Sequence, residues 1–458
     1  MAIATINPTT GQTEQTFEAH DAAEVERRIA LATQAAATLR RASYAQRAEW
    51  SRSTADLLES EVEELARIIT VEMGKPIAQS RAEVLKSVKN LRFYADHAEE
   101  FLADEPLDDP SKVGASQAYA RYQPLGVVLA VMPWNYPIWQ VIRFAAPALM
   151  GGNVGLLKHA SNVPQSALYL DTLFERGGFP AGAFQTLLIG SKEVEAVIAD
   201  PRVRAVTLTG SEPAGRSVGA AAGRSLKPSV LELGGSDPFI VMPSADIAKA
   251  AATAVTARNN NNGQSCIAAK RFIVHEDVYD QFLEAFTAGV SALTVGDPLD
   301  ESVHIGPVAT KGGQQDLIDL VEDALANGAT AVVGGTTPEG DGFFYPPTVL
   351  TGVTPKARLY LEEAFGPVAA VYKVSSLDEA LEIANVTTFG LSSAFWSNDE
   401  AEIARAVAEI DAGATFINGM TVSYSELPFG GIKDSGYGRE LAAAGIREFC
   451  NLKTVWRG

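Results

Sequence analysis

The chain has 458 residues, with 37 basic and 56 acidic side chains, so its formal net charge at pH 7 is −19. Hydrophobic residues make up 47% of the chain and charged residues 20%, which is typical of a folded protein of about two to four domains and excludes a mainly disordered chain. The excess of negative charge disfavours binding to nucleic acids and to anionic membrane surfaces.

The first hundred residues predict a short strand followed by long helices. Residues 6–12 resemble a strand and turn, and the spacing of apolar residues predicts helices over 21–39 and 45–72. Gly74 and Pro76 then supply a helix stop and a new start.

From Val127 onward, short apolar runs alternate with helical patterns. Such alternation predicts βαβ units and a parallel sheet covered on both faces. The stretch 122–142 is free of charge, but its three prolines exclude a membrane-spanning helix. The strand-like runs are 126–131, 153–158, 184–189, 203–209, 229–235 and 237–242, with helices expected after Ser211 and Asp246.

The same rhythm resumes after Cys266 and predicts a second α/β domain. Helices are expected from Val278 and Leu377, and the chain closes with a strand at 451–456. The strand-like runs in between are 270–275, 329–335, 368–374, 393–397 and 413–419.

Cys266 and Cys450 are the only cysteines in the sequence, and neither has clustered Cys or His neighbours. This pattern argues against a disulfide framework and against a zinc site, so we expect no bound metal. Because no basic residue precedes Arg27, the N-terminus lacks the charged region of a secretory signal. We therefore expect a protein of the reducing cytoplasm.

Cys266 follows a polar, turn-rich segment, 258–265, at the start of a new element. A lone cysteine is usually a small buried residue, which is how we interpret Cys450. At residue 266, however, the polar approach predicts an exposed sulfur, and nearby backbone N–H groups can stabilise a thiolate or an oxyanion.

Two further polar residues interrupt apolar patterns. Glu232 lies inside the run 230–235, where a carboxylate is costly unless it is paired or functional, although it can also turn toward solvent at a strand end. Asn135 lies between Pro133 and Pro137, which restrict the backbone, and its amide can donate to a developing oxyanion.

The segment 206–215 predicts a strand, a turn at Gly210 and Ser211, and a helix N-terminus. Such a junction presents backbone donors to a phosphate, although a turn of this kind is often only structural.

Together these segments resemble the aldehyde dehydrogenase superfamily over nearly the whole chain. Glu232 and Cys266 lie 34 residues apart, which is similar to the interval between glutamate and cysteine in that family. The motifs that carry the resemblance are EMGKP at 72–76, PWNYP at 133–137, LTGS at 208–211, LELGG at 231–235, NGQSC at 262–266, EEAFGP at 362–367 and PFGG at 428–431.

The resemblance implies an α/β fold with three modules. These are a Rossmann-like cofactor-binding domain over 1–110 and 126–232, a catalytic domain over 233–425, and a small β oligomerisation arm over 111–125 and 426–458. The arm implies a homodimer or a homotetramer.

The resemblance also implies the catalytic roles. Cys266 attacks an aldehyde carbonyl, its backbone N–H and Asn135 hold the oxyanion, and Glu232 activates water to hydrolyse the thioester. The cofactor contacts implied in the same way are Pro133, Trp134, Lys158, Ser161, Gly210, Ser211, Leu233, Glu363 and Phe365.

Ser161 bears on the choice of cofactor. Many relatives have a glutamate at this place, where a carboxylate binds ribose hydroxyls and repels a 2′-phosphate. Serine removes the repulsion and Lys158 adds positive charge, so we expect NADP to be preferred over NAD. The alternative is that Ser161 is neutral in effect and both cofactors are accepted.

Trp139, Arg143 and Ser423 match pocket positions of NADP-dependent succinate-semialdehyde dehydrogenases. The resemblance implies that Arg143 anchors the far carboxylate of a short ω-carboxy aldehyde, with Ser423 as a hydrogen-bond partner and Trp139 as an apolar wall. An internal ion pair is the alternative role for Arg143. Some relatives have another arginine where this chain has Asn260, so we expect Arg143 to be the single arginine that binds the substrate carboxylate.

Three alternatives remain open on the sequence alone. Glutarate semialdehyde or another small aldehyde is the nearest rival substrate. A cofactor-independent thiol esterase uses the same thiol and glutamate, and a non-enzymatic binding protein is a further class.

Because Ile267 and Ala268 follow Cys266, no second cysteine is near enough for a disulfide within the loop, and we expect peroxide to oxidise Cys266 directly.

Overall fold

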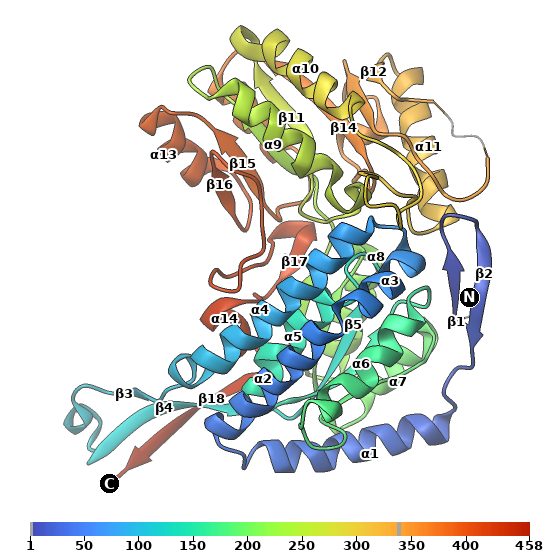
Figure 1. Ribbon diagram of the computed structural model, residues 1–458. Helices are drawn as coiled ribbons and strands as arrows, with labels where there is room; N and C mark the ends of the chain where they lie inside the picture. Colours follow the sequence, from blue (N-terminus) through green and yellow to red (C-terminus); the bar gives the residue numbers. More distant parts are fainter. Residues whose placement is uncertain (1–2, 337–339) are drawn as a thin grey trace.

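The computed structural model describes residues 3–336 and 340–458, which form two lobes and a projecting β arm (Figure 1). The lower lobe in this view contains the N-terminal helices and a six-stranded sheet, and the upper lobe contains a seven-stranded sheet. This arrangement confirms the expected α/β fold.

The chain begins with a hairpin and four helices. The prediction of one continuous helix over 45–72 is wrong, because the chain forms two helices there with Glu61 between them. The carboxylate of Glu61 binds Tyr169 and Arg176, each at 2.7 Å, and these tertiary contacts hold it outside helical geometry. The elements are β1 (Ile3–Asn7), β2 (Gln12–Phe17), α1 (Ala22–Leu39), α2 (Tyr44–Ser60), α3 (Val62–Met73) and α4 (Ile77–Phe101).

The six-stranded sheet is parallel except for one edge strand, β17. Its strands, in spatial order, are β17 (Gly436–Tyr437), β9 (Ser229–Glu232), β8 (Val203–Thr209), β5 (Val127–Met132), β6 (Val154–His159) and β7 (Phe184–Thr186). The helices connecting them are α5 (Trp139–Met150), α6 (Pro164–Arg176), α7 (Val194–Ala199) and α8 (Glu212–Arg224).

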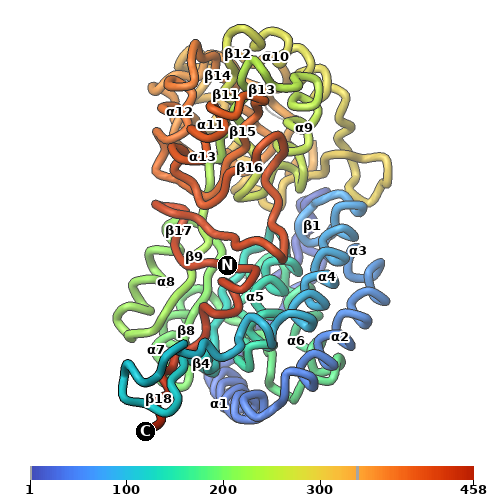
Figure 2. The backbone as a smooth tube through the Cα atoms, turned by 90° about the vertical axis from the view of Figure 1, so that its left-hand side faces the viewer, coloured from blue at the N-terminus to red at the C-terminus, as the bar shows by residue number. Residues whose placement is uncertain are grey.

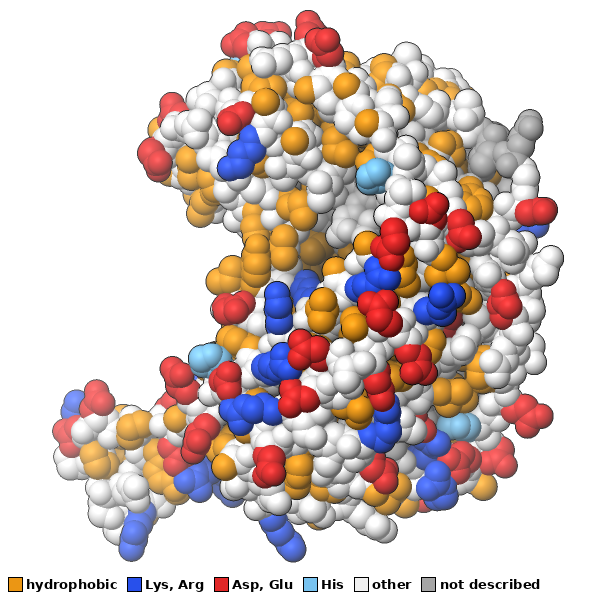
Figure 3. Space-filling model, viewed as in Figure 1, with side chains coloured by type: hydrophobic (Ala, Val, Ile, Leu, Met, Phe, Trp, Pro, Cys, Tyr) orange, Lys and Arg blue, Asp and Glu red, His pale blue; other side chains and the backbone are white. Residues whose placement is uncertain are grey.

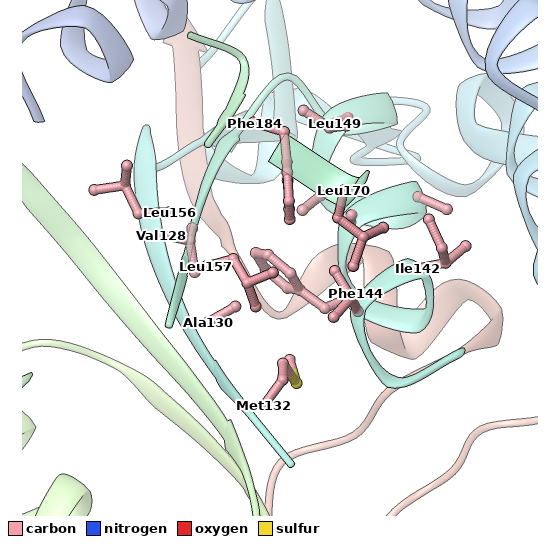
Figure 4. Close-up of a cluster of buried hydrophobic side chains, with 14 of the residues drawn as sticks. Val128, Ala130, Met132, Ile142, Phe144, Leu149, Leu156, Leu157, Leu170 and Phe184 are labelled. Carbon is pink, nitrogen blue, oxygen red and sulfur yellow. The ribbon is translucent and has the colours of Figure 1, made fainter. Parts of the chain in front are cut away.

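Apolar side chains of β5 and β6 pack against α5 and α6 to form the core of this lobe (Figure 4). The fully buried Leu156, Leu157 and Ile142 lie in this cluster, and the ring of Phe144 points into it. Continuous apolar strands are expected for a parallel sheet that is covered on both faces. This core holds the carboxyl edge of the sheet in place.

The seven-stranded sheet is parallel except for β12 and is also covered on both faces. Its strands, in spatial order, are β12 (Thr330–Val333), β13 (Thr348–Thr351), β14 (Val368–Val374), β11 (Ala269–His275), β10 (Asp237–Val241), β15 (Ser393–Trp396) and β16 (Thr415–Ile417). Its helices are α9 (Ile247–Asn259), α10 (Glu276–Ser291), α11 (Lys311–Ala326), α12 (Leu377–Asn385) and α13 (Glu400–Glu409).

The arm is an antiparallel sheet of β18 (Cys450–Arg457), β4 (Gln117–Pro124) and β3 (Glu105–Pro106). The strand expected at 451–456 is therefore confirmed within β18. Of the C-terminal range expected in the arm, 426–458, only β18 joins this sheet, because β17 pairs with the six-stranded sheet. Figure 2 shows the C-terminal segment running from the upper lobe along the lower lobe to the arm.

Shorter helices complete the fold. Helix α14 (Ala442–Arg447) packs against α4 and α5. The 3₁₀ segments are Pro110–Val113, Ser191–Glu193, Asn260–Gly263, Arg358–Tyr360 and Lys433–Ser435. In the described ranges, we find no helix with the length and apolar character needed to cross a bilayer.

Candidate active site

The carboxyl ends of β5, β6, β8 and β9 lie along one edge of the six-stranded sheet. Val131 pairs with both Lys158 and Leu208, and Thr209 pairs with Glu232, so these strands end at a similar level. Ligands of open α/β sheets bind at this edge. The segments that follow these strands bring together Pro133, Trp134, Asn135, Ser161, Gly210, Ser211 and Leu233.

Asparagines hold the loop that carries Cys266. Asn261 and Asn262 adopt left-handed φ values of 60° and 54°, which asparagine tolerates better than most residues. The Asn262 amide donates to the carbonyls of Gly74 at 2.8 Å and Pro307 at 2.9 Å. These hydrogen bonds therefore fix the turn before the cysteine to both lobes.

Lys270 fixes the backbone at the cysteine itself. Its Nζ donates to the carbonyl of Cys266 at 2.6 Å and to that of Ser265 at 2.8 Å. A Cβ atom at Gly235 would lie 2.7 Å from the Cys266 carbonyl oxygen. The second glycine of the LELGG motif therefore allows the loop and β9 to approach closely.

The Cys266 thiol is half-buried and lines an internal cavity. Burial raises its pKa to about 12, and the neighbouring charges of Glu363 and Glu232 add to this rise. Arg143 and Lys270 act in the opposite direction. The sulfur is therefore a thiol at neutral pH in this state, and its reaction as a nucleophile requires a proton acceptor.

Glu232 ends β9 with a side chain that is only 2% exposed. Neither carboxylate oxygen has a hydrogen-bond partner of normal geometry among the described residues. Burial, followed by the charge of Glu440, raises the pKa of Glu232 to about 8. A Cβ atom at Gly430 would lie 2.8 Å from Glu232 Oε1, so the PFGG motif leaves room for this carboxylate. A base with this environment suits proton transfer near neutral pH.

Asn135 is buried beside the cysteine loop. Its Nδ2 donates to the backbone carbonyl of Gln264 at 3.1 Å, and the backbone carbonyl of Asn135 accepts a bond of 3.0 Å from the Asn261 side-chain amide. An amide nitrogen carries two hydrogens, so one remains to be donated to a substrate oxygen.

Glu363 and Phe365 lie between the lobes on the other side of the cysteine loop. Glu363 pairs with Lys270 at 2.9 Å, and the Phe365 ring meets the Trp134 ring edge-on at 5.6 Å. A Cβ atom at Gly234 would lie 2.7 Å from Glu363 Oε2. This glycine keeps space open beside the carboxylate.

The edge of the six-stranded sheet fits a phosphorylated dinucleotide. Ser211 is the N-cap residue of α8 and its side chain makes no capping hydrogen bond, so N–H groups of the first turn remain to bind phosphate. Lys158 lies near the end of β6, which is two strands from β8 in the sheet, and the half-exposed Ser161 follows that strand. Burial lowers the pKa of Lys158, whereas Glu193 raises it.

A cavity of about 270 Å³ opens beside the Cys266 thiol. Figure 3 shows a deep hollow between the two lobes, with hydrophobic side chains along its wall. Trp139, Arg143 and Ser423 all line the cavity, together with Lys86. Its size suits a small substrate rather than a polymer.

Within the cavity wall, Arg143 has a carboxylate partner. Its Nε lies 2.5 Å from Glu440 Oε2, both side chains are buried, and Nη2 donates to Thr209 at 3.3 Å. The alternative of an internal ion pair is therefore observed. The positive charge of Arg143 is balanced within the protein.

The sequence interpretation missed three charged residues at the site, namely Lys86, Lys270 and Glu440. Lys270 opens the strand-like run 270–275, four residues after the cysteine, which was a usable signal. Lys86 and Glu440 lie far from the motifs that surround them in space, and no local pattern identifies them.

Comparison with known proteins places these residues in context. The family model described as "Aldehyde dehydrogenase family" matches residues 1–455. The chain is 62% identical to a protein of Mycobacterium ulcerans named succinate-semialdehyde dehydrogenase [NADP(+)] 1, over the full length of both. It is 62% identical over both full lengths to the protein of that name from Mycobacterium tuberculosis.

Solved structures give the same result. A succinic semialdehyde dehydrogenase of Streptococcus pyogenes, in complex with NADP⁺, superposes with a TM-score of 0.95 at 37% identity, covering 99% of each chain. A succinate-semialdehyde dehydrogenase of Burkholderia pseudomallei superposes with a TM-score of 0.95 at 34% identity, covering 99% of this chain and 94% of its own.

Proposed function

The chain belongs to the aldehyde dehydrogenase family, and we propose that it oxidises succinate semialdehyde to succinate with NADP as the cofactor. The observation that carries this function is the 62% identity, over the full length, to proteins named for that activity. The small cavity beside the half-buried Cys266 supports the same chemistry.

In the first step, the Cys266 sulfur forms a bond to the aldehyde carbon, and the carbonyl electron pair moves to the oxygen. The thiol proton must pass to water in the cavity as this bond forms, because burial keeps the pKa of Cys266 high. The free amide hydrogen of Asn135 and the backbone N–H of Cys266 are proposed to hold the resulting oxyanion.

When bound, NADP supplies the acceptor for the hydride that leaves the former aldehyde carbon. Glu363 and Phe365 are proposed to hold the nicotinamide ribose and ring, with Trp134 against Phe365. Pro133 and Leu233 shape the same groove at the ends of β5 and β9.

Loss of hydride leaves a thioester on Cys266, and Glu232 is proposed to take a proton from the water that attacks it. The new C–O bond forms, the C–S bond breaks, and the products are a carboxylate and the restored cysteine. The raised pKa of Glu232 matches this task.

The preference for NADP is proposed to arise at the end of β6. Ser161 places no carboxylate beside a 2′-phosphate, and Lys158 contributes positive charge close by. Gly210 and Ser211 are proposed to bind the pyrophosphate at the start of α8.

The β arm is proposed to pair copies of the chain into a homodimer or homotetramer. Leu452 and Trp456 of β18 are each 55% exposed, which is unusual for large apolar side chains on one strand. Light scattering of the wild type and of Leu452→Glu tests this assembly, and a monomeric wild type contradicts it.

We also propose a cytoplasmic location, supported by the two free cysteines. The six-stranded sheet is proposed to form the cofactor-binding domain and the seven-stranded sheet the catalytic domain.

Steady-state assays with NADP and NAD test the whole proposal. We expect succinate semialdehyde to have a higher kcat/KM than glutarate semialdehyde or butanal. We also expect kcat/KM to be higher with NADP than with NAD. Turnover without a cofactor would instead indicate a thiol esterase. A preference for a neutral aldehyde would contradict the proposed substrate.

A further inference from the structure

Lys86 of α4 lines the cavity beside Cys266. Its Nζ donates to Ser423 Oγ at 2.6 Å and lies 4.1 Å from the centroid of the Trp139 ring. All three residues line the same cavity as Cys266. An ammonium group therefore lies among the side chains that the family resemblance implies for substrate binding.

Among the described residues, the cavity is lined by three charged side chains: Glu83, Lys86 and Arg143. Glu83 pairs with the buried Lys75, and Arg143 pairs with Glu440. Within the described ranges, the close partners of the Lys86 ammonium are a neutral hydroxyl and an aromatic face, and no carboxylate lies within ion-pair distance. The cavity wall thus carries one positive charge that is not directly balanced.

We propose that the ammonium of Lys86 binds the far carboxylate of the substrate as a second cation beside Arg143, whose Nε contacts Glu440. This inference rests on the proposed function, since it concerns an ω-carboxy aldehyde. Ser423 accepts its hydrogen bond from Lys86, so its own hydroxyl proton is free to be donated to the same carboxylate.

The surroundings of Lys86 connect binding to protonation. Burial, then the charge of Arg143 and finally that of Lys75 lower the pKa of Lys86, and Glu83 and Cys266 oppose them. The net result is a pKa of about 7. Near neutral pH the amine is therefore partly uncharged in the free enzyme. Because a bound carboxylate favours the ammonium form, binding takes up a proton, and affinity falls as pH rises above about 7.

The test compares succinate semialdehyde with butanal, which has the same carbon chain and no carboxylate. In Lys86→Met, we expect the ratio of kcat/KM for succinate semialdehyde to that for butanal to fall by about 10- to 100-fold, mainly through KM. Lys89→Met is the matched control, because Lys89 is an exposed lysine of the same helix. It should retain the wild-type ratio.

Lys86→Arg provides a second, independent readout. Arginine stays charged, so the preference for succinate semialdehyde over butanal should largely persist. The rise in the KM for succinate semialdehyde that we expect in the wild type between pH 7 and pH 9 should disappear in this variant. This variant also serves if the methionine variant does not fold.

The outcomes separate this inference from the proposed function. A wild type that does not prefer succinate semialdehyde over butanal contradicts the proposed function. A wild type with that preference, together with an unchanged ratio in Lys86→Met, overturns the role of Lys86. An unaltered pH dependence in Lys86→Arg overturns it as well.

Discussion

The ammonium of Lys270 donates a hydrogen bond of 2.6 Å to the backbone carbonyl of Cys266. The same nitrogen lies 2.9 Å from Glu363 Oε1, so one lysine connects the nucleophile loop to the motif expected to hold the nicotinamide ribose. We therefore expect Lys270 to affect both the orientation of the cysteine and the binding of the cofactor.

Replacing Lys270 with methionine should disturb both partners. Lys270 lowers the pKa of Cys266, so its loss should raise that pKa further and slow the alkylation of the thiol by iodoacetamide at pH 8. The KM for NADP should also rise by about tenfold, because Glu363 loses its buried partner. Lys249→Met, at an exposed lysine, is the control. Unchanged alkylation in Lys270→Met would contradict the link.

Glu232→Gln should block the second half of the reaction. We expect kcat to fall by about 10² or more, while one equivalent of NADPH per active site still forms in a burst. In the wild type, the carboxylate form is the base, so a deacylation-limited kcat should rise with pH and level off above about 8. Rapid-mixing absorbance and a pH series measure both. A variant without a burst would place Glu232 in the first step instead.

Glu440→Gln should move the same pH profile. The charge of Glu440 raises the pKa of Glu232, so its removal should lower that pKa and shift the acid side of the kcat profile to lower pH. The variant should also be less stable by about 3–5 kcal/mol, because Arg143 keeps a buried charge without its partner. Thermal unfolding and the pH profile check these effects. The exposed Glu426→Gln is the control, and an unmoved profile counts against the coupling.

Ser161→Glu should reverse the cofactor preference. A carboxylate at the end of β6 repels a 2′-phosphate and binds ribose hydroxyls, so kcat/KM for NADP should fall by about tenfold or more relative to NAD. Ser161→Gln has similar bulk without the charge and should change the ratio much less. Equal effects of the two variants would assign the preference to size rather than charge.

Hydrogen peroxide should inactivate the cofactor-free enzyme by oxidising Cys266, because the adjacent Ile267 and Ala268 offer no second thiol. Since burial raises the pKa of this thiol to about 12, inactivation should be slow at pH 7 and should accelerate steadily up to at least pH 10. Mass spectrometry of the peptide that contains residue 266 identifies the product. A rate that levels off near pH 7 would indicate a thiolate already present.

The sequence alone indicated the candidate site residues that belong to local motifs. Cys266 and Glu232 became candidates because a polar loop and a carboxylate interrupt apolar patterns, and such interruptions are visible along the chain. The alternation of strands and helices likewise predicted a parallel sheet and a second α/β domain, and the structure contains two sheets that are parallel except for one edge strand each. Local periodicity was insufficient at Glu61, where contacts with α6 end the helix.

Only the tertiary structure decided which charges are balanced inside the cavity. Arg143 was expected to bind the substrate carboxylate, and the structure shows in addition that α5 and the C-terminal segment bring Glu440 against it. Lys86 was not identified at all, because an isolated lysine on a helix is usually solvated, and the packing of α4 on α5 determines that it faces the cavity. Charge balance depends on distances between segments remote in sequence, and local patterns carry no information about those distances.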